Sequence, residues 1–256
     1  MKANYHTHTF RCGHAQGSDE QYVLAAIEAG FETLGFSDHI PFRGVHAPKD
    51  RMDFDQMDDY LNSIQALKKT YASKIKILVG FEMEYYPELL EYYKEIRSKV
   101  DYLIVGQHYK ALNYYGYDMF NTDADLEVYT SQVCEAMDSG LVSILAHPEY
   151  FMLGRKVWNE ACEKTAHAIA QCAAKNNVFL EINLNGLRFG KQHTNLGEHF
   201  PYPFMPFWDI VAQYPVKCCY GLDAHRPLTL LESHRIDLFH KTLMDKGLTI
   251  DLNPQL

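Results

Sequence analysis

The feature that most constrains this fold is the alternation of short apolar segments with helical patterns along the whole chain. Most of these apolar segments are continuous, which is typical of strands buried on both faces of a parallel sheet. They span residues 3–6, 33–36, 75–79, 102–105, 142–145, 178–182 and 216–220. Helical patterns lie between them, over 19–29, 55–71, 88–99, 123–139, 158–176 and 228–246. This order predicts an α/β fold with a parallel sheet.

Helix ends can also be read from the sequence. Ser18 and Gln21 fit a capping box, and Gly30 is a natural C-terminal stop for the same helix. Pro87 opens the 88–99 helix at the position where a missing N–H costs least. These signals support the predicted alternation of strands and helices.

Length and organisation favour one large domain. The chain has 256 residues, and a β/α barrel typically takes about 250. No linker, low-complexity segment or charge block divides it, so we predict a single domain over residues 1–256. Long irregular stretches at 39–54, 109–122 (with Tyr114, Tyr115 and Tyr117) and 183–206 are expected to line a site.

Residue types that bind metal ions lie at the ends of six of the seven predicted strands. In a parallel barrel these carboxyl ends open onto one face, where active sites are built. The period-two spacing of His6 and His8 points both imidazoles to the same face of a strand. Side chains far apart in the sequence would therefore meet in one cleft. The set is His6, His8, His14, His39, Glu82, His108, His147, Asp223 and His225.

Each of these residues has an ordinary structural explanation when it is taken alone. A single histidine at a strand end is more often a hydrogen-bonded surface or core residue. Glu82 is compatible with a solvated loop, and Asp223 with a cap on a helix that begins near Pro227. The recurrence of such residues at six strand ends favours a metal site.

Short motifs surround these residues, in order from residue 6 to residue 225. They are His6-Thr7-His8-Thr9, Ser37-Asp38-His39, Gly80-Phe81-Glu82, Gly106-Gln107-His108, Ala146-His147-Pro148 and Gly221-Leu222-Asp223-Ala224-His225. Together they resemble the motifs of the polymerase-and-histidinol-phosphatase (PHP) superfamily. The resemblance implies a distorted (β/α)7 TIM-like barrel with a metal site at the C-terminal ends of the strands.

The resemblance also implies three metal ions. The implied ligands are His6, His8, Glu82 and Asp223 for the first ion, Glu82, His108 and His147 for the second, and His14, His39 and His225 for the third. Imidazole and carboxylate ligands suit Zn, Fe or Mn, and ligand type does not choose among them. Glu84 is an alternative to Glu82 as the bridging acid, although the position after Gly80 favours Glu82.

Hydrolysis of a phosphate ester requires an activated water and fixed positive charge. Metal coordination lowers the pKa of water to about 7, so a metal-bridging hydroxide needs no protein nucleophile. Arg188 and Arg155 are candidates to bind the phosphoryl group, because guanidinium can bind phosphate bidentately and both follow strand-end motifs. With Glu82 and Asp223 they form the predicted catalytic set. For Arg155, a solvated cation before a helix is an equally good explanation.

Within the superfamily, the stand-alone chain and Asn185-Gly186-Leu187-Arg188 resemble the monofunctional histidinol-phosphate phosphatases. This implies an enzyme of histidine biosynthesis that hydrolyses L-histidinol phosphate to L-histidinol and phosphate. Two alternatives stay open: a PHP phosphoesterase acting on a nucleotide or other small phosphate ester, and a catalytically silent metal-binding scaffold. The intact ligand set argues against the scaffold.

Charge and hydropathy limit the other partners. The formal net charge is −9 and no run of Lys or Arg is present, so no nucleic-acid partner is expected. No segment approaches the roughly 18 apolar residues of a membrane-spanning helix, and no signal-peptide core follows Met1. The six cysteines contain no C-x-x-C pair, which favours reduced thiols. We therefore expect a cytoplasmic enzyme with a small-molecule substrate and no membrane contact.

Overall fold

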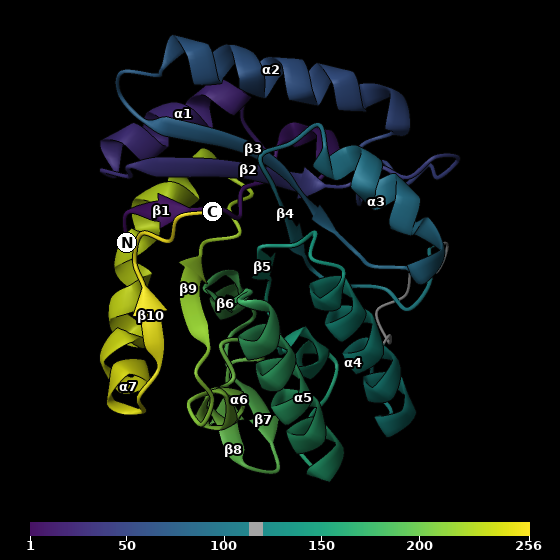
Figure 1. Ribbon diagram of the computed structural model, residues 1–256. Helices are drawn as coiled ribbons and strands as arrows, with labels where there is room; N and C mark the ends of the chain where they lie inside the picture. The colour runs from purple at the N-terminus through teal and green to yellow at the C-terminus, as the bar shows by residue number, and fades with distance from the viewer. Residues whose placement is uncertain (113–119) are drawn as a thin grey trace.

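Eight parallel strands form one curled sheet in the computed structural model, which describes residues 1–112 and 120–256 (Figure 1). The spatial order is β1-β2-β3-β4-β5-β6-β9-β10. The bounds are β1 (Ala3–Asn4), β2 (Thr33–His39), β3 (Lys76–Met83), β4 (Tyr102–Val105), β5 (Ile144–Leu145), β6 (Phe179–Asn183), β9 (Lys217–Gly221) and β10 (Thr249–Asp251). The seven predicted strands correspond to β1 to β6 and β9. Tyr114, Tyr115 and Tyr117 of the expected site loop lie outside the described residues.

The eighth strand, β10, is a difference from the predicted (β/α)7 pattern. It has only three residues, and its central Ile250 pairs with Cys218 of β9. The amide of Lys2 donates to the carbonyl of Leu252 at 2.7 Å, which joins this end of the sheet to the start of the chain. Three residues with little burial leave no periodic signal, so sequence reasoning missed the strand.

Closure of the sheet at its carboxyl end brings the first and last motifs together. An isolated parallel bridge joins Thr7 to Ala224. The amide of His8 donates to the Ala224 carbonyl at 3.0 Å, and the Ala224 amide donates to the His6 carbonyl at 3.1 Å. Residues more than 200 positions apart are therefore backbone neighbours.

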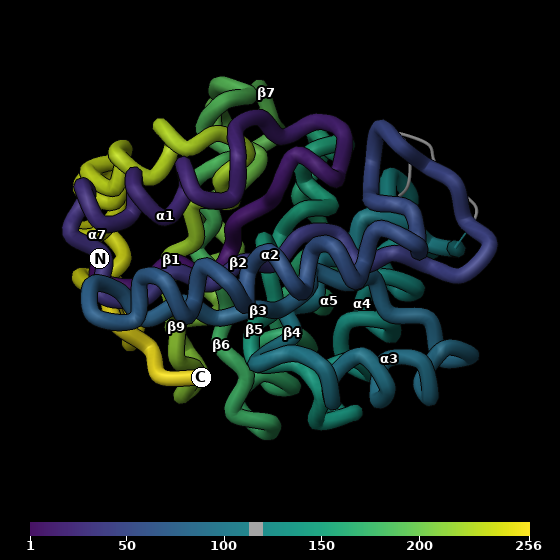
Figure 2. The backbone as a smooth tube through the Cα atoms, turned by 90° about the horizontal axis from the view of Figure 1, so that it is seen from above, coloured from purple at the N-terminus to yellow at the C-terminus, as the bar shows by residue number. Residues whose placement is uncertain are grey.

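Helices cover the outer side of the sheet. Figures 1 and 2 show α1 and α2 on the outer side of β2 and β3, and α4 packs beside α5. The bounds are α1 (Asp19–Glu28), α2 (Met57–Thr70), α3 (Leu90–Arg97), α4 (Asp123–Asp138), α5 (Glu160–Asn176), α6 (Met205–Val211) and α7 (His240–Asp245). The predicted capping box before α1 is present, since Ser18 accepts from the Gln21 amide and the Gln21 side chain accepts from the Ser18 amide. No helix within the described ranges combines the length and apolar character needed to cross a bilayer.

Two regions differ from the predicted pattern. The single helix expected over 228–246 is instead a run of 3-10 turns, η6 (Pro227–Leu238), followed by α7, with non-helical dihedral angles at Glu232. Leu228 and Leu238 of this run remain exposed, so its apolar residues do not form one buried face. The stretch expected to be irregular contains η5 (Asn185–Phe189) and a hairpin of β7 (Gln192–Thr194) and β8 (Gly197–His199).

The interior of the curled sheet is filled by side chains and forms the floor of the site. Tyr102 is fully buried there, and its hydroxyl donates to the carbonyls of Tyr5 at 2.7 Å and Phe36 at 3.0 Å. Leu78 belongs to the same interior cluster, and the two-residue period of a strand places Glu82 on the same face of β3. The apolar interior therefore ends where the polar site begins.

Candidate metal centre

The nine predicted ligands converge at the carboxyl ends of the strands. A cavity of about 130 Å³ is lined by eight of them, and the ninth, His6, is buried beside Glu82 and Asp223. The cavity ligands are His8, His14, His39, Glu82, His108, His147, Asp223 and His225. Strand pairing contributes directly, because the β2–β3 register sets His39 opposite Glu82. The structure thus brings the nine predicted residues together, and their role as metal ligands stays a prediction.

Glu82 is the central carboxylate of the cluster. Five imidazole nitrogens surround its two oxygens. The distances are 3.3 Å from Oε2 to His6 Nε2, 3.5 Å to His8 Nε2 and 3.1 Å to His39 Nδ1, and from Oε1 2.9 Å to His147 Nε2 and 3.6 Å to His108 Nε2. A Cβ atom at residue 106 would lie 1.9 Å from Oε1, so Gly106 leaves the space that this carboxylate occupies.

Asp223 is the second carboxylate and is held in a strained backbone conformation. Its φ is +47°, a region that residues other than glycine rarely adopt. Oδ1 lies 3.1 Å from His8 Nε2 and 3.5 Å from His6 Nε2, while Oδ2 accepts from Asn185 Nδ2 at 3.0 Å. His147 also has a positive φ, of +30°. Strain of this kind is concentrated at functional sites.

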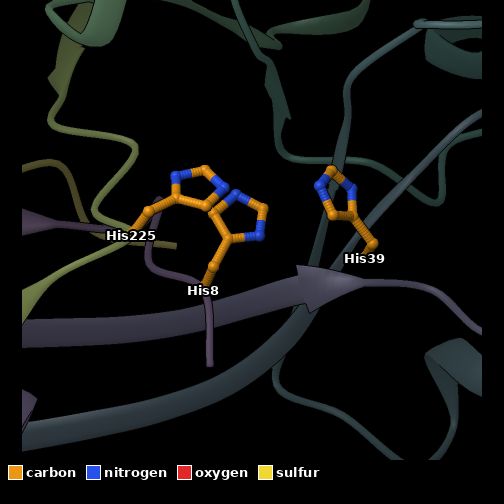
Figure 3. A group of neighbouring side chains, drawn as sticks. All are labelled: His8, His39 and His225. Carbon is orange, nitrogen blue, oxygen red and sulfur yellow. The ribbon is translucent and has the colours of Figure 1, made fainter. Parts of the chain in front are cut away.

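A third group of imidazoles lies at the open side of the cluster. Figure 3 shows His8 and His225 next to one another, with His39 across from them at the end of β2. One ring nitrogen of each lies within 4.8 Å of the others. His14 completes the group, because its Nε2 is 3.0 Å from Nε2 of His225.

Several buried polar atoms of this cluster have no hydrogen-bond partner. Each buried polar group without a partner lowers the stability of the fold by about 1–3 kcal/mol. So many unpaired groups at one place therefore indicate a ligand-binding site. The atoms are His6 Nε2, His8 Nδ1 and Nε2, His39 Nδ1, Glu82 Oε2, His147 Nδ1 and Asp223 Oδ1. Imidazole nitrogens and carboxylate oxygens that face each other form a donor set for transition-metal ions. The residues present therefore fit metal ions.

The protonation states also suit metal binding. Burial alone would raise the pKa of Glu82, but His6, His108 and His39 hold it well below its usual range. Burial likewise opposes ionisation of Asp223, and His6 and His225 keep its pKa well below normal. Burial, together with positive charge at His8, lowers the pKa of His39 and of His225 well below the usual value. The site thus holds ionised carboxylates beside neutral His39 and His225, while neighbouring carboxylates raise the pKa of His6, His8 and His108, whose protons bound metal ions would displace.

Acids below and beside the cluster orient individual imidazoles. His6 Nδ1 lies 2.9 Å from Glu181 Oε1, and His108 Nδ1 lies 3.0 Å from Glu84 Oε1. A hydrogen bond at Nδ1 leaves the lone pair of Nε2 facing the site. Glu84 is turned toward His108 and Arg51, whereas Glu82 lies at the centre, so Glu84 is not the central acid.

Glu181 was missed by sequence reasoning. It lies in β6, it is 2% exposed, and it accepts from the His147 amide at 3.2 Å as well as from His6. A Cβ atom at residue 221 would lie 1.7 Å from Glu181 Oε1, so Gly221 makes room for this side chain. The available signal was an ionisable residue inside an otherwise apolar strand, since buried charges require partners.

The two candidate arginines differ in position. Arg188 lies in η5, lines the cavity, is exposed and stacks over Phe189 at 4.7 Å. No carboxylate of the described residues forms an ion pair with it. Arg155 does not line the cavity: its guanidinium donates to the Asn121 carbonyl at 2.7 Å and to Asp123 Oδ1 at 2.6 Å. It is 6% exposed, so it is not a solvated cation, and this position gives no support to the predicted phosphate contact.

Comparison with known proteins supports the interpretation of the motifs. The sequence profile of the PHP domain matches residues 4–185. A protein of Deinococcus radiodurans named probable histidinol-phosphatase is 28% identical over 238 residues, covering 87% of this chain and 85% of that protein. A probable phosphatase of Tolumonas auensis is 26% identical over 180 residues, covering 70% and 62% of the two chains.

A solved structure has the same fold. It is the histidinol phosphate phosphatase of Lactococcus lactis in complex with Zn, L-histidinol and phosphate. The TM-score is 0.71 at 17% identity, and the match covers 97% of this chain and 95% of that chain. The likeness confirms the predicted α/β, TIM-like architecture.

Proposed function

This chain belongs to the PHP domain family, and we propose that it is a metal-dependent phosphomonoesterase that hydrolyses L-histidinol phosphate to L-histidinol and phosphate. The convergence of seven imidazoles and two carboxylates around one cavity, with buried donor atoms that lack partners, carries this proposal. The name of the Deinococcus relative supports the substrate, as do the ligands of the Lactococcus enzyme.

We assign the metal ligands in three groups. His6, His8, Glu82 and Asp223 hold one ion, and Glu82 with His108 and His147 holds a second. His14, His39 and His225 hold a third. Short distances within each group support the assignment, from His6 and His8 to Asp223, from His108 and His147 to Glu82, and from His14 to His225. Zn, Fe and Mn all suit this mixture of ligands.

Bound metal ions would supply positive charge and an activated water for hydrolysis. The protein contributes the arrangement of the donors. Glu82 and Asp223 are ionised and neutralise part of the ionic charge, while Glu181 fixes the orientation of His6. The remaining positive charge attracts a phosphate ester into a chain whose total charge is −9.

Arg188 is assigned to the phosphoryl group of the substrate. Its guanidinium is exposed at the cavity, comes from a different element than the ligands, and is not occupied by a carboxylate of the described residues. The phosphoryl oxygens carry negative charge in the reaction. A fixed guanidinium can donate two parallel hydrogen bonds to them and stabilise that charge. Glu82, Asp223 and Arg188 are therefore the residues that we expect to act on the substrate.

The direct test is release of inorganic phosphate from L-histidinol phosphate by metal-loaded protein, with an aryl phosphate as the control. We expect a kcat/KM of about 10⁴ M⁻¹s⁻¹ or more, well above the aryl ester. Activity on the aryl ester alone would instead indicate a different small phosphate ester as the substrate. A fully metal-loaded protein that hydrolyses neither would indicate a silent scaffold.

Three further expectations stay predictions. These are a single domain over residues 1–256, a cytoplasmic location and the absence of a nucleic-acid partner. The assignment of three ions is likewise a proposal, which metal analysis of the purified protein tests directly.

A further inference from the structure

One acid at the cavity is not accounted for by the metal ligands. Asp50 lines the cavity together with Glu82 and Asp223, and it is the remaining acid of the described lining residues. Its side chain is 23% exposed. Asp50 lies in the loop after β2, one of the long stretches that the sequence analysis expected to line a site.

Two neighbours hold the Asp50 carboxylate in place. Oδ1 accepts from the Tyr109 hydroxyl at 2.5 Å. Oδ2 accepts from Arg51, at 2.9 Å from Nε and 2.7 Å from Nη2. The Arg51 side chain is 2% exposed, so the carboxylate is anchored from the protein side while part of it faces the cavity.

Among the described residues, Asp50 shares its guanidinium partner with a second carboxylate. Arg51 is paired with Asp50 and also with Glu84, at 2.9 Å from Nη1 to Glu84 Oε2. The Arg51 guanidinium thus pairs with two carboxylates. Glu84 also contacts Nδ1 of His108. In the described part of the chain, two carboxylates therefore share the one guanidinium of Arg51 at the edge of the cavity.

The negative charge of Asp50 is placed to bind a cationic group of the substrate that lies close to the substrate's phosphate. Asp50 is linked through Arg51 and Glu84 to His108, a proposed metal ligand. In L-histidinol phosphate the ammonium group is on the carbon next to the one that bears the phosphate ester. It must therefore lie within a few ångströms of the phosphoryl group, whereas the imidazole extends further away.

Aromatic rings beside Asp50 and His108 strengthen this fit. Tyr109 contacts Asp50 directly, and its ring lies 6.1 Å from that of His108. The Tyr150 ring lies 5.0 Å from that of His108 and also lines the cavity. Aromatic faces attract ammonium groups, and this attraction increases where water is excluded.

We propose that Asp50, anchored by Arg51 and Tyr109, binds the ammonium group of the substrate and makes the site selective for amino-alcohol phosphate esters. This inference rests on the proposed function and names the residue that recognises its substrate. A carboxylate placed for an ammonium group discriminates against analogues that lack this group, because those analogues do not make the charged hydrogen bond.

The test compares two esters and two variants. The esters are L-histidinol phosphate and 3-(imidazol-4-yl)propyl phosphate, which is identical except for the missing amino group. Asp50→Asn keeps the volume and an acceptor for Tyr109 but removes the charge. Asp53→Asn is the matched control, since Asp53 lies on the same loop, pairs with His46 at 2.8 Å and does not line the cavity.

We expect Asp50→Asn to lower kcat/KM for L-histidinol phosphate by about tenfold or more, mainly through KM, with little change for the deamino ester. Asp53→Asn should change neither value. Tyr109→Phe should produce a smaller loss in the same direction, which provides a second variant if Asp50→Asn folds poorly. Metal content and Tm of each variant show whether the centre is intact.

Equal losses on both esters would overturn the inference, because they would indicate that Asp50 only supports Arg51 and His108. Unchanged kinetics on both esters would overturn it as well. If wild-type protein hydrolyses other phosphate esters but neither of these two, the proposed function fails and the inference fails with it. If the wild-type protein is fully active on L-histidinol phosphate and Asp50→Asn has no effect, the inference fails but the proposed function stands.

Discussion

The Nδ1 atom of His6 lies 2.9 Å from Oε1 of Glu181, and both side chains are almost completely buried. The two residues are 175 positions apart and meet inside the curled sheet. The carboxylate accepts the Nδ1 proton, so Nε2 presents its lone pair toward Glu82 and Asp223. Glu181 thereby sets the orientation of His6, a proposed metal ligand.

Glu181→Gln is expected to weaken metal binding by about 10- to 100-fold, because the glutamine removes the charge that orients and polarises His6. The measurement is a chelator-competition titration of the purified protein. Glu163→Gln, on the exposed face of α5, is the control and should bind metal normally. Equal affinities in the Glu181 variant and the wild type would show that Glu181 serves packing only.

Glu82→Ala and Asp223→Ala are each expected to abolish turnover and lower the metal content. Both carboxylates face imidazole nitrogens at 2.9–3.6 Å, so their removal deletes donors from the centre of the site. Elemental analysis and phosphate release test the two effects together. Glu91→Ala, with an exposed side chain that pairs only with Lys94 among the described residues, provides the control. Unchanged metal stoichiometry in both site variants would refute the ligand assignment.

Arg188→Ala is expected to leave the metal content unchanged and to lower kcat/KM by about 10- to 100-fold, as for the loss of a charged hydrogen bond. The loss should appear with any phosphate ester, because the guanidinium is assigned to the phosphoryl group. Steady-state kinetics on L-histidinol phosphate and on an aryl phosphate test this. Wild-type kinetics on both esters would show that Arg188 is not a phosphate ligand.

Arg155→Ala is expected to affect stability instead of catalysis. The guanidinium joins the Asn121 carbonyl to Asp123 at the start of α4, so its loss should lower the free energy of unfolding by about 0.5–3 kcal/mol. Urea unfolding measures this change, and the KM for phosphate esters should stay the same. A raised KM with unchanged stability would return Arg155 to the phosphate-binding set.

Glu149→Gln is expected to alter the pH dependence of stability. Burial raises the pKa of Glu149 from 4.5 to about 8, although it accepts hydrogen bonds from the Phe204 amide and from Trp208. Between these two pH values the unfolded chain releases a proton that the folded chain retains, so rising pH favours unfolding. The stabilisation of the folded state by the proton on Glu149 is fully present below pH 4.5 and is lost as the pH rises through 8.

Urea titrations of metal-free protein at pH 5, 7 and 8 would detect this slope. The glutamine variant cannot ionise, so its stability should decline less over this interval than that of the wild type. Parallel curves for the two proteins would mean that Glu149 is ionised in the folded state across the whole range.

Much of the architecture and most of the site could be predicted from the sequence alone. Continuous apolar segments indicate buried parallel strands, and the carboxyl ends of such strands share one face. His39, Glu82, His108 and His147 each follow or end a predicted strand, so their convergence requires only that the sheet forms. The strand β10 and the broken helix over 228–246 escaped prediction, because short or unevenly buried segments carry a weak periodic signal.

The tertiary structure decided which distant groups become partners. The bridge between Thr7 and Ala224 brings His6 and His8 against Asp223. Hydrogen bonds to the Asn121 carbonyl and to Asp123 hold Arg155 away from the cavity. A local pattern specifies on which face of a strand a side chain lies, but the partner of a buried charge depends on how the sheet curls and closes. The sequence by itself therefore determined the set of candidate ligands, and closure of the sheet determined how they are paired and which acids orient them.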